Sequence, residues 1–158
     1  MPLQTAVVNP AKKKDDPREG TLSDAWLGWM QDQNDILKKA PIVVGFKSLT
    51  LQTASIVSTE IPSSVLSIGV YRVSYYVRVT APASVSSSII VSFQWTDYGI
   101  ACSKDFAAVS GNVVTAVGSD SFLIAVDGAT KVSYSTTYAS SGIGMTYKLE
   151  IILEQVRV

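Results

Sequence analysis

The sequence predicts a mainly β protein: an antiparallel β-sandwich or jelly roll of about eight strands, preceded by one short N-terminal α-helix and an extended arm. From residue 40 onward, Val, Ile, Ser and Thr dominate, and apolar residues alternate with polar ones over short runs. Gly, Pro, Ser and Asn separate these runs at short intervals, as turns do between strands. Strands and helices do not alternate along the chain, which argues against a parallel sheet.

Residues 1–20 are predicted to form an extended anchoring arm. Pro10, Pro17 and the charged run from Lys12 to Asp16 disfavour a packed element. Two interpretations remain open for this segment. It is either a frayed terminus, or an arm that orders against a neighbouring subunit with Val7 and Val8 as its anchor.

Residues 21–39 are predicted to form an amphipathic helix. Thr21 can cap its start, Lys38 and Lys39 suit the negative end of the helix dipole, and Pro41 ends it.

One stripe of this helix follows a 4-3-4-3 spacing, which is typical of a short coiled coil. The stripe consists of Leu22, Trp26, Trp29, Gln33 and Ile36. We expect these residues to mediate assembly as a multi-chain stalk in which Gln33 sets the register. The alternative is a single helix that packs across one edge of the sheet.

Residues 40–158 are predicted to form the β-sandwich or jelly-roll domain. The strongest candidate strand covers residues 70–80, with Tyr71, Val73, Tyr75, Val77 and Val79 on one face. The other candidates, in order, are residues 42–46, 49–51, a run at Ile56, 89–96, 100–102, 113–117, 121–126, 131–138 and 145–154.

The composition argues against several classes of function. Thirteen basic and thirteen acidic residues cancel, so no global charge favours nucleic acid or an anionic membrane. The chain has no histidine and a single cysteine, Cys102, which excludes a disulfide within the chain and a cysteine-based zinc site. No signal peptide and no apolar run long enough to insert into a membrane is visible. We therefore expect no enzyme activity, no cofactor and no metal site.

Two weaker chemical alternatives remain. The carboxylates Asp97, Asp105, Asp120 and Asp127 fall at predicted strand ends, where they suit turn capping or, less simply, a calcium site between two loops. Glycoside cleavage by paired carboxylates would have to draw on Glu60, Glu150 or Glu154.

Several stretches resemble small structural proteins of tailed-phage virions, of the head-fibre, capsid-decoration or tail-fibre type. They are Gly69–Val79, Phe93–Ala101, Thr136–Ser140, Met145–Glu154 and the upstream Trp26–Trp29 helix. A weaker likeness exists to the trimeric jelly rolls of the C1q and tumour-necrosis-factor type, in which a Gly-x-Tyr strand lies near the three-fold axis.

The phage resemblance implies a non-enzymatic structural protein of a bacteriophage virion, synthesised in the host cytoplasm and assembled as a homotrimer. The arm and helix would attach it to capsid or tail proteins, without nucleic-acid binding or membrane insertion. The alternative is a module on the virion that binds a host receptor or a glycan, with Tyr98 and Tyr138 as candidate surface contacts.

Overall fold

A computed structural model describes residues 28–33, 40–63, 66–128 and 130–156. The chain divides into two units, Met1–Lys39 and Ala40–Val158, and each is considered by itself. In the first unit, residues 28–33 are helical, in agreement with the predicted helix over the part that is described. Trp29 and Gln33 lie four residues apart on this helix and therefore share a face.

The second unit contains nine strands among its described residues. Their bounds are β1 Ile42–Gln52, β2 Ile56–Glu60, β3 Gly69–Ala81, β4 Ser87–Asp97, β5 Ile100–Asp105, β6 Val109–Ser110, β7 Val117–Val126, β8 Ser133–Ser140 and β9 Thr146–Val156. Every pairing between them is antiparallel.

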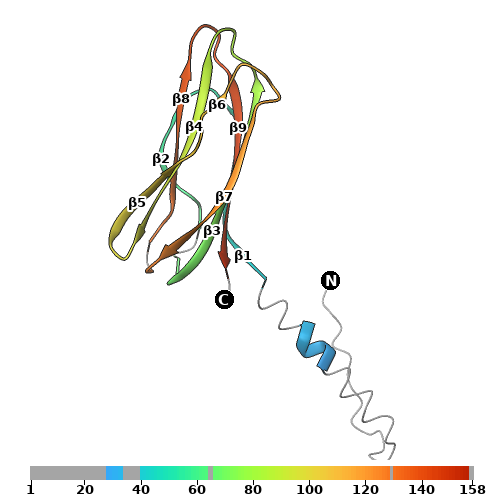
Figure 1. The fold of residues 1–158 in the computed structure, drawn as a ribbon, viewed down its shortest axis with the longest axis vertical. Coiled ribbons are helices and arrows are strands. Elements are labelled where there is room, and N and C mark those ends of the chain that lie inside the picture. The colour runs from blue at the N-terminus through green and yellow to red at the C-terminus, as the bar shows by residue number, and fades with distance from the viewer. Residues whose placement is uncertain (1–27, 34–39, 64–65, 129, 157–158) are drawn as a thin grey trace, which may run out of the picture. The chain divides into compact units, whose positions relative to one another are not determined.

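The strands form two sheets packed face to face (Figure 1). Sheet A has the order β1-β9-β3-β7, and sheet B has the order β2-β8-β4-β5, with the short β6 also paired to β4. Four of these neighbours are nested pairs: β1 with β9, β2 with β8, β3 with β7 and β4 with β5. The second unit is therefore a jelly roll, which is one long antiparallel hairpin rolled into two sheets. The predicted fold class is confirmed.

The core lies between the sheets and is built by one face of each strand. Tyr71, Val73, Val77 and Val79 of β3 are almost fully buried, as the alternation in this strand predicts. On β9 the buried residues are Tyr147, Leu149, Ile151 and Leu153. From sheet B, Ile89, Val91 and Phe93 of β4 complete the contact.

The predicted strand over residues 113–117 is wrong, and the short strand β6 was not predicted. Residues 113–116 form turns, and β7 begins only at Val117. The Asn112 side chain accepts a hydrogen bond from the Ser87 amide (3.0 Å), and the Ala116 amide donates to the Val113 carbonyl (3.1 Å). These bonds close a turn that the apolar residues Val113 and Val114 do not indicate by themselves.

Buried tyrosines carry polar groups into this core. The Tyr147 hydroxyl donates to the Ala54 carbonyl at 2.8 Å and shares a 2.9 Å hydrogen bond with the Thr136 hydroxyl. Burial raises the pKa of Tyr75, Tyr134 and Tyr147 above the ordinary 10.0. The fold therefore favours the neutral phenols.

We predict that the protein loses stability at alkaline pH. Because the folded pKa values are raised, the contribution of these tyrosines is fully present below pH 10.0 and declines as the pH rises above it. Urea unfolding, measured from neutral to strongly alkaline pH, should show a constant free energy of unfolding followed by a fall. Tyr147→Phe should make this fall shallower and cost about 1–2 kcal/mol at neutral pH, since Thr136 and Ala54 lose their partner. A flat profile in the wild type would contradict the prediction.

Candidate functional site

The outer face of sheet A is the candidate functional site. Outward residues follow from the register, because residues directly opposite in an antiparallel pair share a face. Ile152 lies between the buried Ile151 and Leu153, so it points outward, as do its partners Phe46 on β1 and Ser74 on β3. The sheet A face is defined by Val43, Phe46, Arg72, Ser74, Tyr76, Arg78, Val117, Ser119, Ser121, Leu123, Lys148, Glu150, Ile152 and Glu154.

This face exposes large apolar side chains on three of its four strands. Phe46 is 53% exposed on β1, Leu123 is 63% exposed on β7, and Ile152 on β9 lies beside Phe46. Val43 and Val117 are also exposed. An antiparallel sheet with a solvated face normally alternates buried apolar with exposed polar residues. Apolar residues on the outer face are typical of a contact surface.

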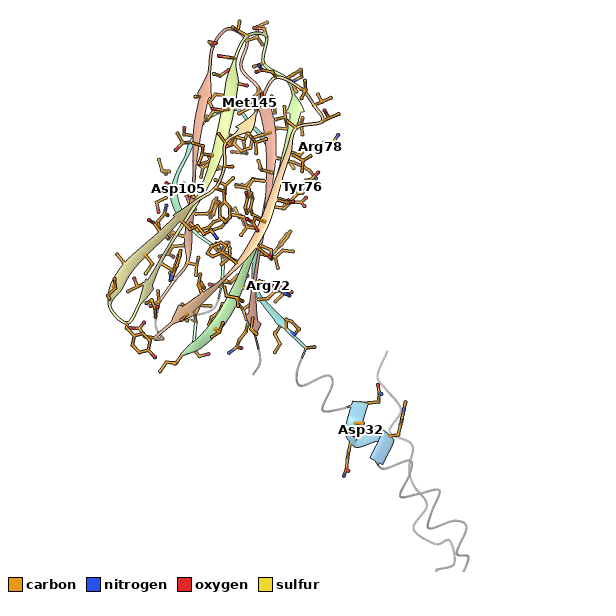
Figure 2. All side chains as sticks on the ribbon, viewed as in Figure 1. Asp32, Arg72, Tyr76, Arg78, Asp105 and Met145 are labelled. Atoms are coloured by element: carbon orange, nitrogen blue, oxygen red, sulfur yellow. The ribbon has the colours of Figure 1, made fainter. Side chains whose placement is uncertain are left out.

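Four of the five charged side chains of the sheet A face form ion pairs within it. Arg72 contacts the Glu154 carboxylate through Nη2 at 2.6 Å and Nε at 2.8 Å. Lys148 lies 3.4 Å from Glu150 and 5.0 Å above the centre of the Tyr76 ring. Figure 2 shows Arg78, Tyr76 and Arg72 along β3, away from Asp105 on sheet B. The paired charges reduce the electrostatic cost of bringing another surface close.

The outer face of sheet B has a different character. Most of its outward residues are small and hydroxylated, including Ser92 and Thr96 on β4 and Ser135 and Thr137 on β8. On this face, Gln94 of β4 is hydrogen-bonded to Ser58 of β2 (3.1 Å) and to Ser135 of β8 (3.0 Å). The contrast favours the outer face of sheet A as the candidate contact surface.

A second exposed feature is the turn that joins β4 to β5 (Figure 1). Tyr98 and Gly99 form this two-residue turn with φ values of 47° and 76°, which is the pattern of a type I′ hairpin. Asn, Asp or Gly normally occupies the first position, because a bulky residue is strained there. Tyr98 nevertheless occupies it and is 78% exposed. Strain of this kind is often retained where a side chain makes a contact.

The two predicted surface tyrosines do not come together. Tyr138 pairs with Ile89, whereas Tyr98 follows Asp97 at the other end of β4, so roughly 27 Å separates them at about 3.4 Å per residue. Tyr138 also has internal contacts: its ring stacks on Tyr147 with centroids 6.2 Å apart, and its hydroxyl donates to the Met145 carbonyl (3.1 Å). Of these two tyrosines, Tyr98 is the one with an open aromatic ring.

Most of the predicted assembly stripe lies outside the described residues. These are Leu22, Trp26 and Ile36, together with Val7 and Val8 of the arm. Trp29 and Gln33 are described, and both are exposed on the helical segment 28–33. The stalk therefore stays a prediction.

Sequence reasoning did not identify the apolar residues of the sheet A face, although a signal was present. The runs Phe122-Leu123-Ile124 and Ile151-Ile152-Leu153 are continuously apolar, where a strand with one buried face would alternate. Each run places one large residue on the outer side of the sheet.

The structure brings no metal-binding group of side chains together in its described part. Within residues 28–33, 40–63, 66–128 and 130–156, no cluster of three or more His, Cys, Asp or Glu could hold a metal ion. In the same part of the chain, no helix has the length and apolar character needed to cross a membrane.

Similarity to known proteins is confined to solved structures. No protein-family model matches the chain, and no curated protein sequence matches it. Among solved structures, it is similar to the carbohydrate-binding module TmCBM61, solved in complex with beta-1,4-galactotriose. That match has a TM-score of 0.43 and 16% sequence identity, and it covers 68% of each chain.

The strain at Tyr98 gives a testable expectation. We predict that Tyr98→Asn stabilises the protein by about 1 kcal/mol, since Asn tolerates positive φ better than Tyr. Gly99→Ala at the neighbouring position should destabilise it by about 1 kcal/mol. Urea unfolding of both variants measures the effect. An unchanged or lowered stability in Tyr98→Asn would show that the turn stores no strain.

Proposed function

We propose that the chain is a non-enzymatic structural protein of a bacteriophage virion that assembles as a homotrimer through the sheet A face. The observation that carries this proposal is the exposure of Phe46, Leu123 and Ile152 on one face of a jelly roll. The resemblance of its strands to head-fibre, decoration and tail-fibre proteins supplies the virion context. The first 39 residues would attach it to a capsid or tail protein.

The chemistry of the sheet A face supports association with copies of itself. Burial of exposed apolar surface stabilises an interface by roughly 25 cal/mol per Å². The ion pairs Arg72–Glu154 and Lys148–Glu150 are already formed within one chain, so burial would leave these four charges with partners. In a cyclic trimer each copy would contact its two neighbours through two different parts of this face, and closure of the ring would limit growth.

We predict that the full chain has a solution mass three times its 16.9 kDa, and that Ile152→Lys abolishes the association. Ile152 lies near the centre of the sheet A face, beside Phe46 and Ser74, so a buried lysine there would be unpaired. Sedimentation equilibrium over a range of concentrations measures both masses. Ile90→Lys is the matched control, because Ile90 lies on the outer face of sheet B and pairs with Thr137.

Two results would count against this proposal. A wild-type chain that stays monomeric at high concentration would exclude the trimer. If the Ile152→Lys variant is folded and still trimeric, another part of the chain must mediate the association. The virion context is tested separately, by immunogold electron microscopy of particles of the phage that encodes the chain, where intact particles should be labelled.

Tyr98 favours a second candidate function, the binding of a host receptor or a glycan. Its exposed ring at the tip of a hairpin is a suitable anchor for a partner surface. Binding of the full chain to host cells should then be lost in Tyr98→Ser and retained in Val57→Ser, which changes an equally exposed residue on β2.

A further inference from the structure

A groove lies on one side of the sandwich, between the free edge of β7 and the segment around β6. Its lining consists of Tyr75, residues 106–110 and residues 116–120, and its volume is about 520 Å³. Two hydrogen bonds hold its walls: the Phe106 amide donates to the Val91 carbonyl at 3.0 Å, and the Val79 amide donates to the Ala116 carbonyl at 3.1 Å. The volume falls within the range of small-ligand sites.

Gly118 sets the width of this groove. A Cβ at Gly118 would lie 2.5 Å from Val109 Cγ2 and 3.9 Å from the Tyr75 hydroxyl. Any side chain there would therefore push the two walls apart and fill the space above Tyr75. The absence of a side chain lets Val109 approach β7 while the hydroxyl remains accessible.

The Tyr75 hydroxyl is the first polar group of the groove. Tyr75 is only 7% exposed, its ring packs against Phe106 with centroids 4.6 Å apart, and its hydroxyl forms no hydrogen bond with any described residue. Burial, and secondarily the negative charge of Asp120, raises the pKa of Tyr75. The phenol is therefore a neutral hydrogen-bond donor that lacks a partner within the described chain.

Asp120 is the second polar group. It lies directly opposite Tyr75 in the β3–β7 register, on an exposed edge. One oxygen of its carboxylate accepts the Ser121 amide at 2.7 Å, which fixes the side chain. The other oxygen has no partner among the described residues and can accept a hydrogen bond from a ligand.

We propose that this groove binds a neutral, hydroxylated ligand of the size of a pyranose unit in a glycan. A sugar hydroxyl can donate to Asp120, while another accepts from Tyr75. The apolar side chains of Phe106 and Val109 would contact its C–H groups. The single carboxylate disfavours anions, and a metal ion would require more oxygen or nitrogen ligands. The groove shares Val117 and Ser119 with the sheet A face, whereas Tyr75 and Asp120, which would bind the sugar, are not part of that face.

The test is NMR titration of the full chain with glucose, galactose, mannose, N-acetylglucosamine and rhamnose, each as the free sugar and as a short oligosaccharide. At least one sugar should shift the amide signals of residues 106–110 and 116–120. Tyr75→Phe keeps the ring and removes the hydroxyl, and Asp120→Asn removes the charge. Each should weaken binding about tenfold, as the loss of one hydrogen bond to a buried or charged group predicts.

Tyr134→Phe and Asp105→Asn are the matched controls, since both make the same chemical change outside the groove. Their affinities should equal that of the wild type. The proposal is overturned if no sugar shifts the groove amides, or if Asp120→Asn binds as tightly as the wild type. Asp120 is exposed, so this variant remains informative even if Tyr75→Phe fails to fold. A tighter oligosaccharide would identify a glycan chain, rather than a free sugar, as the natural ligand.

Discussion

The constraint on which this structure depends is the nested antiparallel pairing of the chain about the Tyr98-Gly99 turn. Asp97 pairs with Ile100, Gly69 with Val126 and Ile42 with Gln155. In each pair the two partners lie almost equally far along the chain from that turn. A slip of one residue anywhere in this series would exchange the buried and exposed faces of a strand. The register that the turn sets must therefore place the apolar residues of every strand on the buried face.

The same pairing determines which surfaces the domain can offer. Rolling the long hairpin leaves β7 at the edge of sheet A and β5 at the edge of sheet B. Between them, Phe93, Phe106 and Phe122 form a contiguous aromatic cluster, and Lys104 lies over the rings of Phe106 and Phe122. This cluster closes one stretch of the side, and the groove at Tyr75 opens beside it.

Sequence patterns predicted those parts of the fold in which one strand face is buried and the other is polar. The buried face of β3 is correct because Tyr71, Val73 and Val77 alternate with polar residues. Residues 113–116 were mistaken for a strand because their turn depends on Asn112 bonding to Ser87, a contact between distant segments. Such contacts depend on the register of the whole hairpin, which a short window of sequence does not contain. The groove could not be predicted from the sequence for the same reason, since Gly118, Val109 and Tyr75 meet only in the folded domain.

The pairing of Ile42 with Gln155 has a mechanical consequence. Hydrogen bonds in an antiparallel pair run perpendicular to the strands. A force that separates Ile42 from Gln155 would unzip the two strands, because it breaks the β1–β9 hydrogen bonds one after another. A force between Ile42 and the loop at Ile143, which precedes the opposite end of β9, would instead slide β1 along β9 and load their bonds together. The domain would therefore resist a force between Ile42 and that loop better than a force between Ile42 and Gln155.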